Sequence, residues 1–380
     1  MLKIQPDVTS VHVHSEETER IMLYLSQFCP NVKQLVVESF VLGNIISFKQ
    51  GFLNLTYLYI SFRTTASTLH QKAIRSYINS TMKHVTALPK LRNLGVFNDM
   101  YSCEDSDEEP YTDEWSEMRE LESLNVHCED HDFNRRLVRY CPDDIIFICL
   151  SNIKSEVLHL LLRNKTFPNL DAVCFYNCEF SSEEMSNFVQ TFGSQLKYLA
   201  IMDTPFSNEH MLQLTDSQPT KLRAFDCDNV GSDIVAGGGL TRFIRQCGGR
   251  LTRLNLGGNS LNEHILREIL ENCPLVVKQG EWDFTWWPNL SPRGFYNLID
   301  KAGPTLTHLI NVSSLDEMVS NGYLEELALM GNGMKKKLRL NFRGKYMPLP
   351  VLLLLGEGEV GDHRIDYRDT CLVLQAPRIL

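Results

Sequence analysis

The stretch that decides the fold is LTRLNLGGN at residues 251–259. Two shorter copies of the same pattern precede it, LKYLAI at residues 196–201 and LRAFDC at residues 222–227. Each copy has apolar residues at its first, fourth and sixth positions, and a polar turn and a helix-like segment follow. In a strand the fourth and sixth residues point to one side, so they are expected to anchor a core while the residues between them face outward.

The spacing of these copies predicts the fold. They start at residues 196, 222 and 251, which fits the strand-plus-helix period of about 20–29 residues in leucine-rich repeats. One such unit cannot bury its own apolar face, so the units must stack. We therefore expect an α/β leucine-rich-repeat solenoid, with a curved parallel sheet on the concave side and helices on the convex side.

Two copies end in asparagine. Asn259 completes the copy at residues 251–259, and Asn332 completes LEELALMGN at residues 324–332. An amide side chain can both donate and accept, so it can satisfy backbone groups of the neighbouring turn that would otherwise be buried without partners. Two full matches in one chain strongly indicate the repeat class.

Further copies of the pattern set the expected domain organisation. They start at residues 8, 32, 55, 91, 121 and 170, with a weaker unit around residues 145–149. We expect a repeat domain over residues 1–332, with an acidic loop inserted at about 102–117 and an irregular repeat at about 276–304. Residues 333–380 are expected to form an irregular C-terminal cap. We interpret the acidic loop as solvated, with phosphorylation of Ser106, which three acids follow, as the alternative.

Composition argues against several kinds of partner. The 380 residues have a formal net charge of −10, and no block of Lys and Arg exceeds residues 335–337, so no nucleic-acid partner is expected. The sequence begins without a signal peptide and has no apolar run of membrane-spanning length, so no membrane partner is expected either. Eleven cysteines without a C-x-x-C pair indicate reduced thiols and a cytoplasmic or nuclear protein.

The sequence predicts no enzyme, metal or cofactor. Nucleophile-elbow, kinase and phosphate-loop motifs are missing from it. The densest group of ligand-type residues is HCEDHD at residues 127–132. We interpret it as a polar turn rather than a zinc site, because His127 follows a strand directly and the next helix is expected to begin near Phe133. Cys174 and Cys178 are interpreted as core packing rather than as metal ligands.

The outward-facing strand residues form the predicted binding site. In such solenoids they line the concave side, which commonly binds partners, and here they mix aromatic and polar groups that suit a protein. The predicted protein-binding residues are Tyr57, Tyr59, Asn93, Ser123, Asn125, Tyr198, Asp226, Arg253 and Asn255. An alternative patch is the tryptophan group of Trp282, Trp286 and Trp287. Tryptophans are frequent binding hot spots, but the group could instead seal the irregular repeat.

A junction between helix and strand carries a family resemblance. It reads CPNV at residues 29–32 and FPNL at 167–170, with LPKL at 88–91 and Cys-Pro steps at 141–142 and 273–274. The residue before proline packs inward, proline stops the helix, and the strand follows. Cys178 stands where other copies have asparagine. This junction and the L-x-x-L-x-L-x-x-C/N pattern resemble the cysteine-containing leucine-rich repeats of F-box proteins.

The resemblance implies a non-enzymatic function. In that family the repeats select a protein substrate, and an N-terminal F-box joins an SCF-type ubiquitin ligase. No F-box precedes Val8 in this sequence, so a ligase adaptor and a cullin are expected partners of a longer form that carries one. The alternative is a repeat scaffold or adaptor unrelated to ubiquitin transfer.

Overall fold

The computed structural model describes residues 7–13, 18–40, 51–62, 71–98, 115–128, 130–164, 166–231, 233–259, 261–278, 281–283, 291, 294, 297–298, 301–302, 308–312, 338–342 and 371–374. The chain divides into two compact units. The first comprises Met1–Phe192 with Asp203–Pro205, and the second Gly193–Met202 with Phe206–Leu380.

Within each unit, parallel strands follow one another in sequence order, as a leucine-rich-repeat solenoid requires. The first unit contains β1 (Ser10–Val13), β2 (Gln34–Phe40), β3 (Tyr57–Phe62), β4 (Asn93–Asn98), β5 (Ser123–Cys128), β6 (Phe147–Ser151) and β7 (Ala172–Tyr176). The second contains β8 (Tyr198–Met202), β9 (Ala224–Asp228) and β10 (Arg253–Asn255). The predicted fold class is confirmed.

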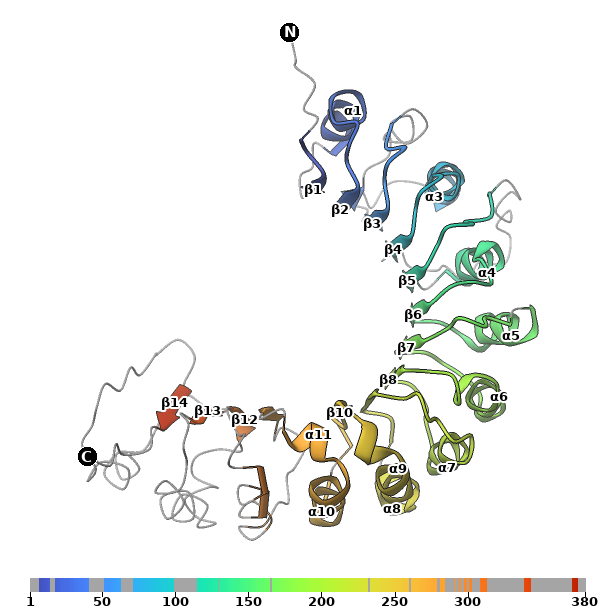
Figure 1. Cartoon of the computed structure of the whole chain (residues 1–380). Helices are drawn as coiled ribbons and strands as arrows, with labels where there is room; N and C mark the ends of the chain where they lie inside the picture. The colour runs from blue at the N-terminus through green and yellow to red at the C-terminus, as the bar shows by residue number, and fades with distance from the viewer. Residues whose placement is uncertain are drawn as a thin grey trace. The chain divides into compact units, whose positions relative to one another are not determined.

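Helices alternate with the strands and cover one face of the sheet in each unit (Figure 1). The first unit has α1 (Thr18–Phe28), α3 (Gln71–Thr86), α4 (His131–Tyr140), α5 (Ser155–Asn164) and α6 (Ser182–Phe192). The second has α7 (Asn208–Asp216), α8 (Asp233–Ala236), α9 (Gly239–Cys247), the 3-10 turn η1 (Gly248–Arg250), α10 (Glu263–Asn272) and α11 (Pro274–Val277). We call the opposite face of the sheet, within each unit, the helix-free face.

The core lies between the strands and the helices. The first inward anchor of each strand from β2 to β7 is at most 2% exposed; these residues are Leu35, Leu58, Leu94, Leu124, Ile148 and Val173. The alternation of buried anchors with less buried neighbours follows the two-residue period of a strand. It therefore fixes which side chains reach the helix-free face.

The side chains at the asparagine position of the repeats bond to the backbone of the neighbouring turn, as the repeat pattern predicts. We call Asn259 and Cys178, which stand at this position, the polar ladder. Asn259 is 2% exposed and donates to the carbonyl oxygen of Leu256 at 3.1 Å and to that of Cys227 in the preceding repeat. Its Oδ1 accepts from the backbone N–H of Val230. Cys178 occupies the same place in the repeat that starts at residue 170, and its thiol donates to the carbonyl oxygen of Leu150 at 3.3 Å. Asn332 lies outside the described residues.

The proline junctions also match the prediction, with one difference. Cys29, Leu88, Cys141, Phe167 and Cys273 are all buried. Pro274, however, is the first residue of the short helix α11 rather than the start of a strand. Proline lacks an N–H and has a fixed φ, which suits the first position of a helix.

Two boundary predictions were wrong. Helix α4 begins at His131 and not near Phe133, because the carboxylate of Asp130 caps it by accepting from the backbone N–H groups of Asp132 and Phe133 at 3.0 and 3.1 Å. The acidic loop does not extend to residue 117 as a solvated segment, since Trp115 is buried, donates to Asn79 Oδ1 at 2.6 Å and packs its ring on Phe133. Ser106 lies outside the described residues.

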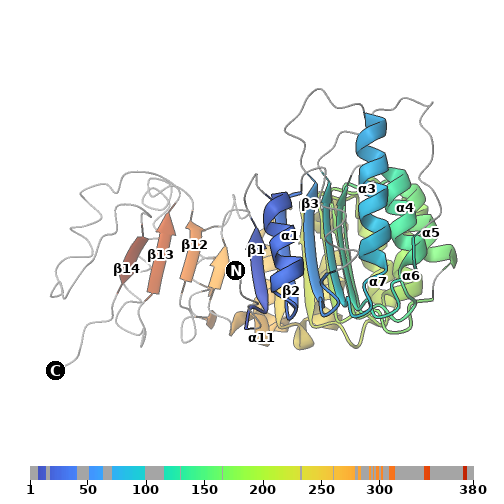
Figure 2. The same cartoon turned by 90° about the horizontal axis from the view of Figure 1, so that it is seen from above.

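A second, four-stranded sheet lies within the second unit. It is formed by β11 (Glu281–Asp283), β12 (His308–Val312), β13 (Leu338–Phe342) and β14 (Cys371–Leu374). The first three strands are parallel and β14 pairs antiparallel with β13 (Figure 2). None of the helices in the described residues has the length and apolar character that a membrane span needs.

Candidate functional site

In the first unit, strand register gathers five of the predicted binding residues on the helix-free face. One row runs Tyr57, Asn93, Ser123 across β3, β4 and β5, and the next runs Tyr59, Gly95, Asn125. Tyr57 is 39% exposed, and Asn125 is exposed as well. These side chains therefore form one continuous surface of aromatic and neutral polar groups.

The position of Tyr59 depends on the residue beside it. A Cβ atom on Gly95 would lie 2.5 Å from Cδ2 of the Tyr59 ring, which is far inside van der Waals contact. The ring therefore lies against the bare backbone of β4, and Tyr59 is half-buried as a result. Glycine is needed here for close approach, so Gly95 shapes the surface although it contributes no side chain.

In the second unit, three predicted residues form a single hydrogen-bonded group. Arg253 Nε donates to Asp226 Oδ1 at 2.9 Å, and Arg253 Nη2 lies 2.8 Å from Asp226 Oδ2. The hydroxyl of Tyr198 donates to the same Oδ2 at 2.8 Å. The guanidinium carbon lies 6.0 Å from the centroid of the Tyr198 ring, at the outer limit of a cation–π contact.

Asp226 and Arg253 differ in how far their side chains are buried. The Asp226 side chain is 1% exposed, whereas that of Arg253 is 61% exposed. A buried carboxylate needs paired charge and hydrogen bonds, and Arg253 and Tyr198 supply both. The paired fork holds the guanidinium in one orientation with its remaining edge toward solvent. The arrangement is suited to contacting a carbonyl, a carboxylate or an aromatic face of a partner.

The remaining predicted residues are less suited to binding or cannot be placed. Asn255 is half-buried, and its Oδ1 accepts from the backbone N–H of Gly257 at 3.1 Å, so it supports the turn after β10. The backbone of Trp282 lies in β11, but its side chain is outside the described part. Trp286 and Trp287 lie wholly outside the described residues.

Sequence reasoning missed several residues of the helix-free face. The ring of Phe97 stacks on that of His127, with centroids 4.4 Å apart and planes 7° apart. Phe147 is half-buried and Tyr176 is 41% exposed. The structure buries Ile148 and Leu150 as the anchors of β6, which leaves Phe147 and Cys149 as its outward residues.

The polar side chains at the ends of β5, β6 and β7 form a chain of contacts. The side-chain amide of Asn177 donates to Asn152 Oδ1 at 2.7 Å, and the amide nitrogen of Asn152 lies 3.1 Å from His127 Nε2. Asn152 and Asn177 have φ values of 58° and 49°, in the left-handed region that asparagine tolerates better than most residues. The group orders this edge of the sheet and gives His127 a polar contact in the next repeat.

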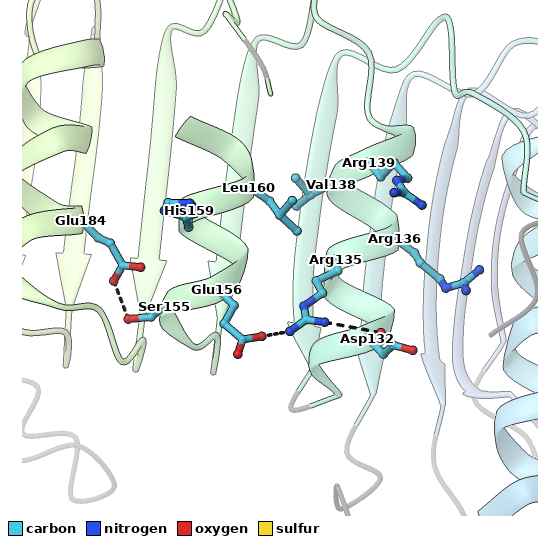
Figure 3. Close-up of a pocket in the computed structure, with 10 residues that line it drawn as sticks. All are labelled: Asp132, Arg135, Arg136, Val138, Arg139, Ser155, Glu156, His159, Leu160 and Glu184. Atoms are coloured by element: carbon cyan, nitrogen blue, oxygen red, sulfur yellow. Dashed lines mark hydrogen bonds and ion pairs between the residues drawn. The ribbon is translucent and has the colours of Figure 1, made fainter. Parts of the chain in front are cut away.

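A polar groove lies on the helix side of the first unit, between α4, α5 and α6 (Figure 3). It has a volume of about 560 Å³ and is lined by Asp132, Arg135, Arg136, Val138, Arg139, Ser155, Glu156, His159, Leu160 and Glu184. Arg135 pairs with Glu156, and Ser155 donates to Glu184. Arg135 thus links α4 to α5 by an ion pair. No group of three or more potential metal ligands occurs among the residues that the structure describes.

Comparisons with known proteins support the fold. No protein-family model and no curated protein sequence matches the chain. A chain in the crystal structure of the Rad7 and Elc1 complex in yeast matches with a TM-score of 0.51 and 13% identity, over 82% of this chain and 81% of that chain. A chain in the crystal structure of the TLR13–ssRNA13 complex matches with a TM-score of 0.35 and 14% identity, over 80% and 44% of the two chains. The first match agrees with a leucine-rich-repeat fold for most of this chain.

Proposed function

We propose that the chain is a protein-recognition module whose helix-free face binds a protein partner. The observation that carries the proposal is the Arg253–Asp226–Tyr198 group, in which a buried carboxylate holds a largely exposed guanidinium. Arginine and tyrosine are among the residues most enriched in binding hot spots, and a preformed orientation lowers the entropy lost on binding. The tyrosine-bearing rows of the first unit provide further contact area of the same kind.

A finer proposal is that the partner is a substrate of an F-box-type ubiquitin ligase. One observation favours it. The Cys-Pro junctions are buried and Cys178 takes the place of the ladder asparagine, as in the cysteine-containing repeats that the sequence resembles. The matched yeast structure is a complex of two proteins, which accords with a protein partner in either function. A repeat scaffold without a link to ubiquitin transfer is the alternative, and either function fits a cytoplasmic or nuclear protein.

The test compares two arginines that differ in face. Arg253 lies on the helix-free face, whereas Arg242 on α9 forms an exposed ion pair with Asp216 at 2.5 Å on the helix side. Tagged wild-type chain, Arg253→Ala and Arg242→Ala are used for affinity purification with quantitative mass spectrometry. We expect a partner that is depleted at least about fivefold by Arg253→Ala, which corresponds to roughly 1 kcal/mol, and retained by Arg242→Ala.

Two other results would change the proposal. Equal retention of every partner by the two variants, with both folded, would contradict binding on this face. Recovery of partners without ligase adaptor or cullin subunits, using a form of the protein that carries an F-box if one exists, would favour the scaffold. Recovery of those subunits together with the partner supports the ligase function.

A further inference from the structure

Two cysteines lie next to each other on the helix-free face of the first unit. Cys149 on β6 and Cys174 on β7 are direct partners in the parallel register. Cys149 is half-buried and Cys174 is 7% exposed. Neighbouring strands lie about 4.8 Å apart, and the Cα atoms of a disulfide are usually about 4.4–6.8 Å apart. The register therefore places the two Cα atoms at a spacing within the range found in disulfides.

The surroundings of Cys149 favour its thiolate. A hydrogen bond from the Cys174 side chain lowers the pKa of Cys149 below its ordinary value, against the effect of burial, and Ser151 adds a second hydrogen bond. Burial instead raises the pKa of Cys178 and of Cys273 to about 12. The thiolate is the nucleophilic form of cysteine. Among the nine cysteines that the structure describes, none of which forms a disulfide, Cys149 alone is both partly exposed and shifted toward the reactive form.

We propose that Cys149 and Cys174 are an oxidative modification site at which a hydroperoxide produces a cross-strand disulfide. The Cys149 sulfur attacks the terminal oxygen of the hydroperoxide, the O–O bond breaks, and the alkoxide leaves as an alcohol after taking a proton. The Cys174 sulfur then attacks the sulfenic sulfur of Cys149. The S–O bond breaks, and hydroxide leaves with the Cys174 proton as water. Two thiols lose two electrons, and the hydroperoxide is reduced to alcohol and water.

Cys178 is the nearest alternative to Cys174 as the second thiol. Its Sγ donates to the carbonyl oxygens of Leu150 and Tyr176 at 3.3 and 3.4 Å. Cys178 lies after the end of β7, so it is not paired with Cys149 in the strand register. These bonds hold the Cys178 thiol in the buried ladder between repeats. Cys174 is therefore the resolving cysteine, and the site stands whether or not the helix-free face binds a partner.

The experiment uses reduced full-length chain and hydrogen peroxide at one equivalent. Remaining thiols are blocked with an alkylating reagent, and the protein is digested without reduction for tandem mass spectrometry. Trypsin releases Cys149 together with Cys141, and Cys174 together with Cys178, so variants must assign the bond. We expect the two peptides to be linked in the wild type and in Cys141→Ala and Cys178→Ala, and separated again by dithiothreitol.

Variants of the two proposed cysteines should give distinct products. Cys174→Ser should lose the link and accumulate sulfenic acid on Cys149, trapped by dimedone, while Cys149→Ser should lose both products. Circular dichroism checks that each variant is folded. If Cys174→Ser fails to fold, links that persist in both Cys141→Ala and Cys178→Ala still assign the bond to Cys149 and Cys174. No link between these peptides in folded wild type, or a link that persists without Cys174, would overturn the proposal.

Discussion

Arg253 and Asp226 form a two-point contact between neighbouring strands, with Nε to Oδ1 at 2.9 Å and Nη2 to Oδ2 at 2.8 Å. Arg253 pairs in the backbone register with Ala224, and Asp226 with Asn255. The side chains thus meet diagonally across the sheet rather than directly. Both were predicted from the sequence as separate surface residues, yet they act as one group in which only the arginine is available to a partner.

The first prediction separates the charge of Arg253 from its geometry. Arg253→Lys keeps the positive charge but loses the two-point contact with Asp226, because an ammonium group cannot match a carboxylate in this way. We expect Arg253→Lys to weaken partner binding nearly as much as Arg253→Ala, by about 1–2 kcal/mol. Calorimetric titration of the purified partner measures this, and melting curves show whether either variant is unfolded. Full affinity in Arg253→Lys would mean that charge alone is recognised.

The second prediction concerns the packing of Tyr59 on Gly95. Gly95→Ala places a methyl group 2.5 Å from Tyr59 Cδ2, so the ring must move or the strands must shift, and stability should fall. Tyr59→Ala removes the obstacle, so the double variant should be more stable than the two single effects predict when added. We expect a coupling energy of about 0.5–3 kcal/mol from denaturant titrations.

Gly249→Ala is the matched control for that experiment. An added Cβ at Gly249 meets nothing within 4 Å. It should leave stability nearly unchanged and show no coupling to Tyr59→Ala. Additive effects of Gly95→Ala and Tyr59→Ala would contradict the contact.

The third prediction tests the polar ladder. Asn259→Ala deprives the carbonyl oxygens of Cys227 and Leu256 and the N–H of Val230 of their partner. A buried polar group without a partner costs about 1–3 kcal/mol, so we expect a loss of at least about 2 kcal/mol in the free energy of unfolding. Gln246→Ala, at an exposed position on α9, serves as the control and should lie within about 0.5 kcal/mol of wild type. Equal stability of the two variants would show that the ladder is unimportant.

The repeat architecture could be predicted because its determinants are local. The anchors of LKYLAI and LRAFDC, the ladder asparagine Asn259 and the residue before each junction proline all follow from a short pattern, and the structure buries them as predicted. The same pattern assigned Tyr198, Asp226 and Arg253 to the outward side. Their hydrogen bonds could not be predicted, because diagonal contacts depend on the stagger between neighbouring strands and on side-chain length.

The residues that the sequence analysis missed lie where apolar and polar residues do not alternate along the strand. Residues 145–150 read IIFICL, so every position is apolar and the two-residue alternation that distinguishes the faces of a strand vanishes. The outward position of Cys149 is therefore visible only in the structure, as is its pairing with Cys174. Trp115 was assigned to the acidic loop because its burial rests on Asn79 and Phe133, which belong to other repeats.

The fourth prediction concerns acid stability in the second unit. The Glu268 side chain is 5% exposed and accepts from Arg245 Nε at 2.8 Å. Hydrogen bonds from Arg245 hold the pKa of Glu268 below its ordinary value, against the opposing effect of burial. A depressed carboxyl pKa stabilises the fold above the pKa of the unfolded chain, about 4.3. This stabilisation is lost as the pH falls through the lower pKa of the folded state.

Melting curves recorded from pH 7 down to pH 3 test this. The difference in melting temperature between wild type and Glu268→Gln should be largest near neutral pH and should shrink in the acid range. Glu271→Gln, at an exposed position on the same helix, should follow the wild type throughout. A difference that stays constant with pH would show that the ionised form of Glu268 contributes no stability.

The last prediction corrects an expectation drawn from the pattern. Leu254 is the fourth residue of the most complete repeat, and the pattern predicts a fully buried anchor whose change to aspartate would unfold the region. The structure shows Leu254 half-buried, whereas its register partner Phe225 is 0% exposed. The physical reason is that β10 is the last strand of its sheet among the residues that the structure describes, so no further described strand of that sheet covers its outer edge. An unpaired charge costs less where water can reach it. We expect Phe225→Asp to abolish the cooperative melting transition, and Leu254→Asp to lower the melting temperature while retaining a transition. Loss of the transition in both variants would restore the original expectation, and the comparison needs only circular dichroism melts of the purified chains.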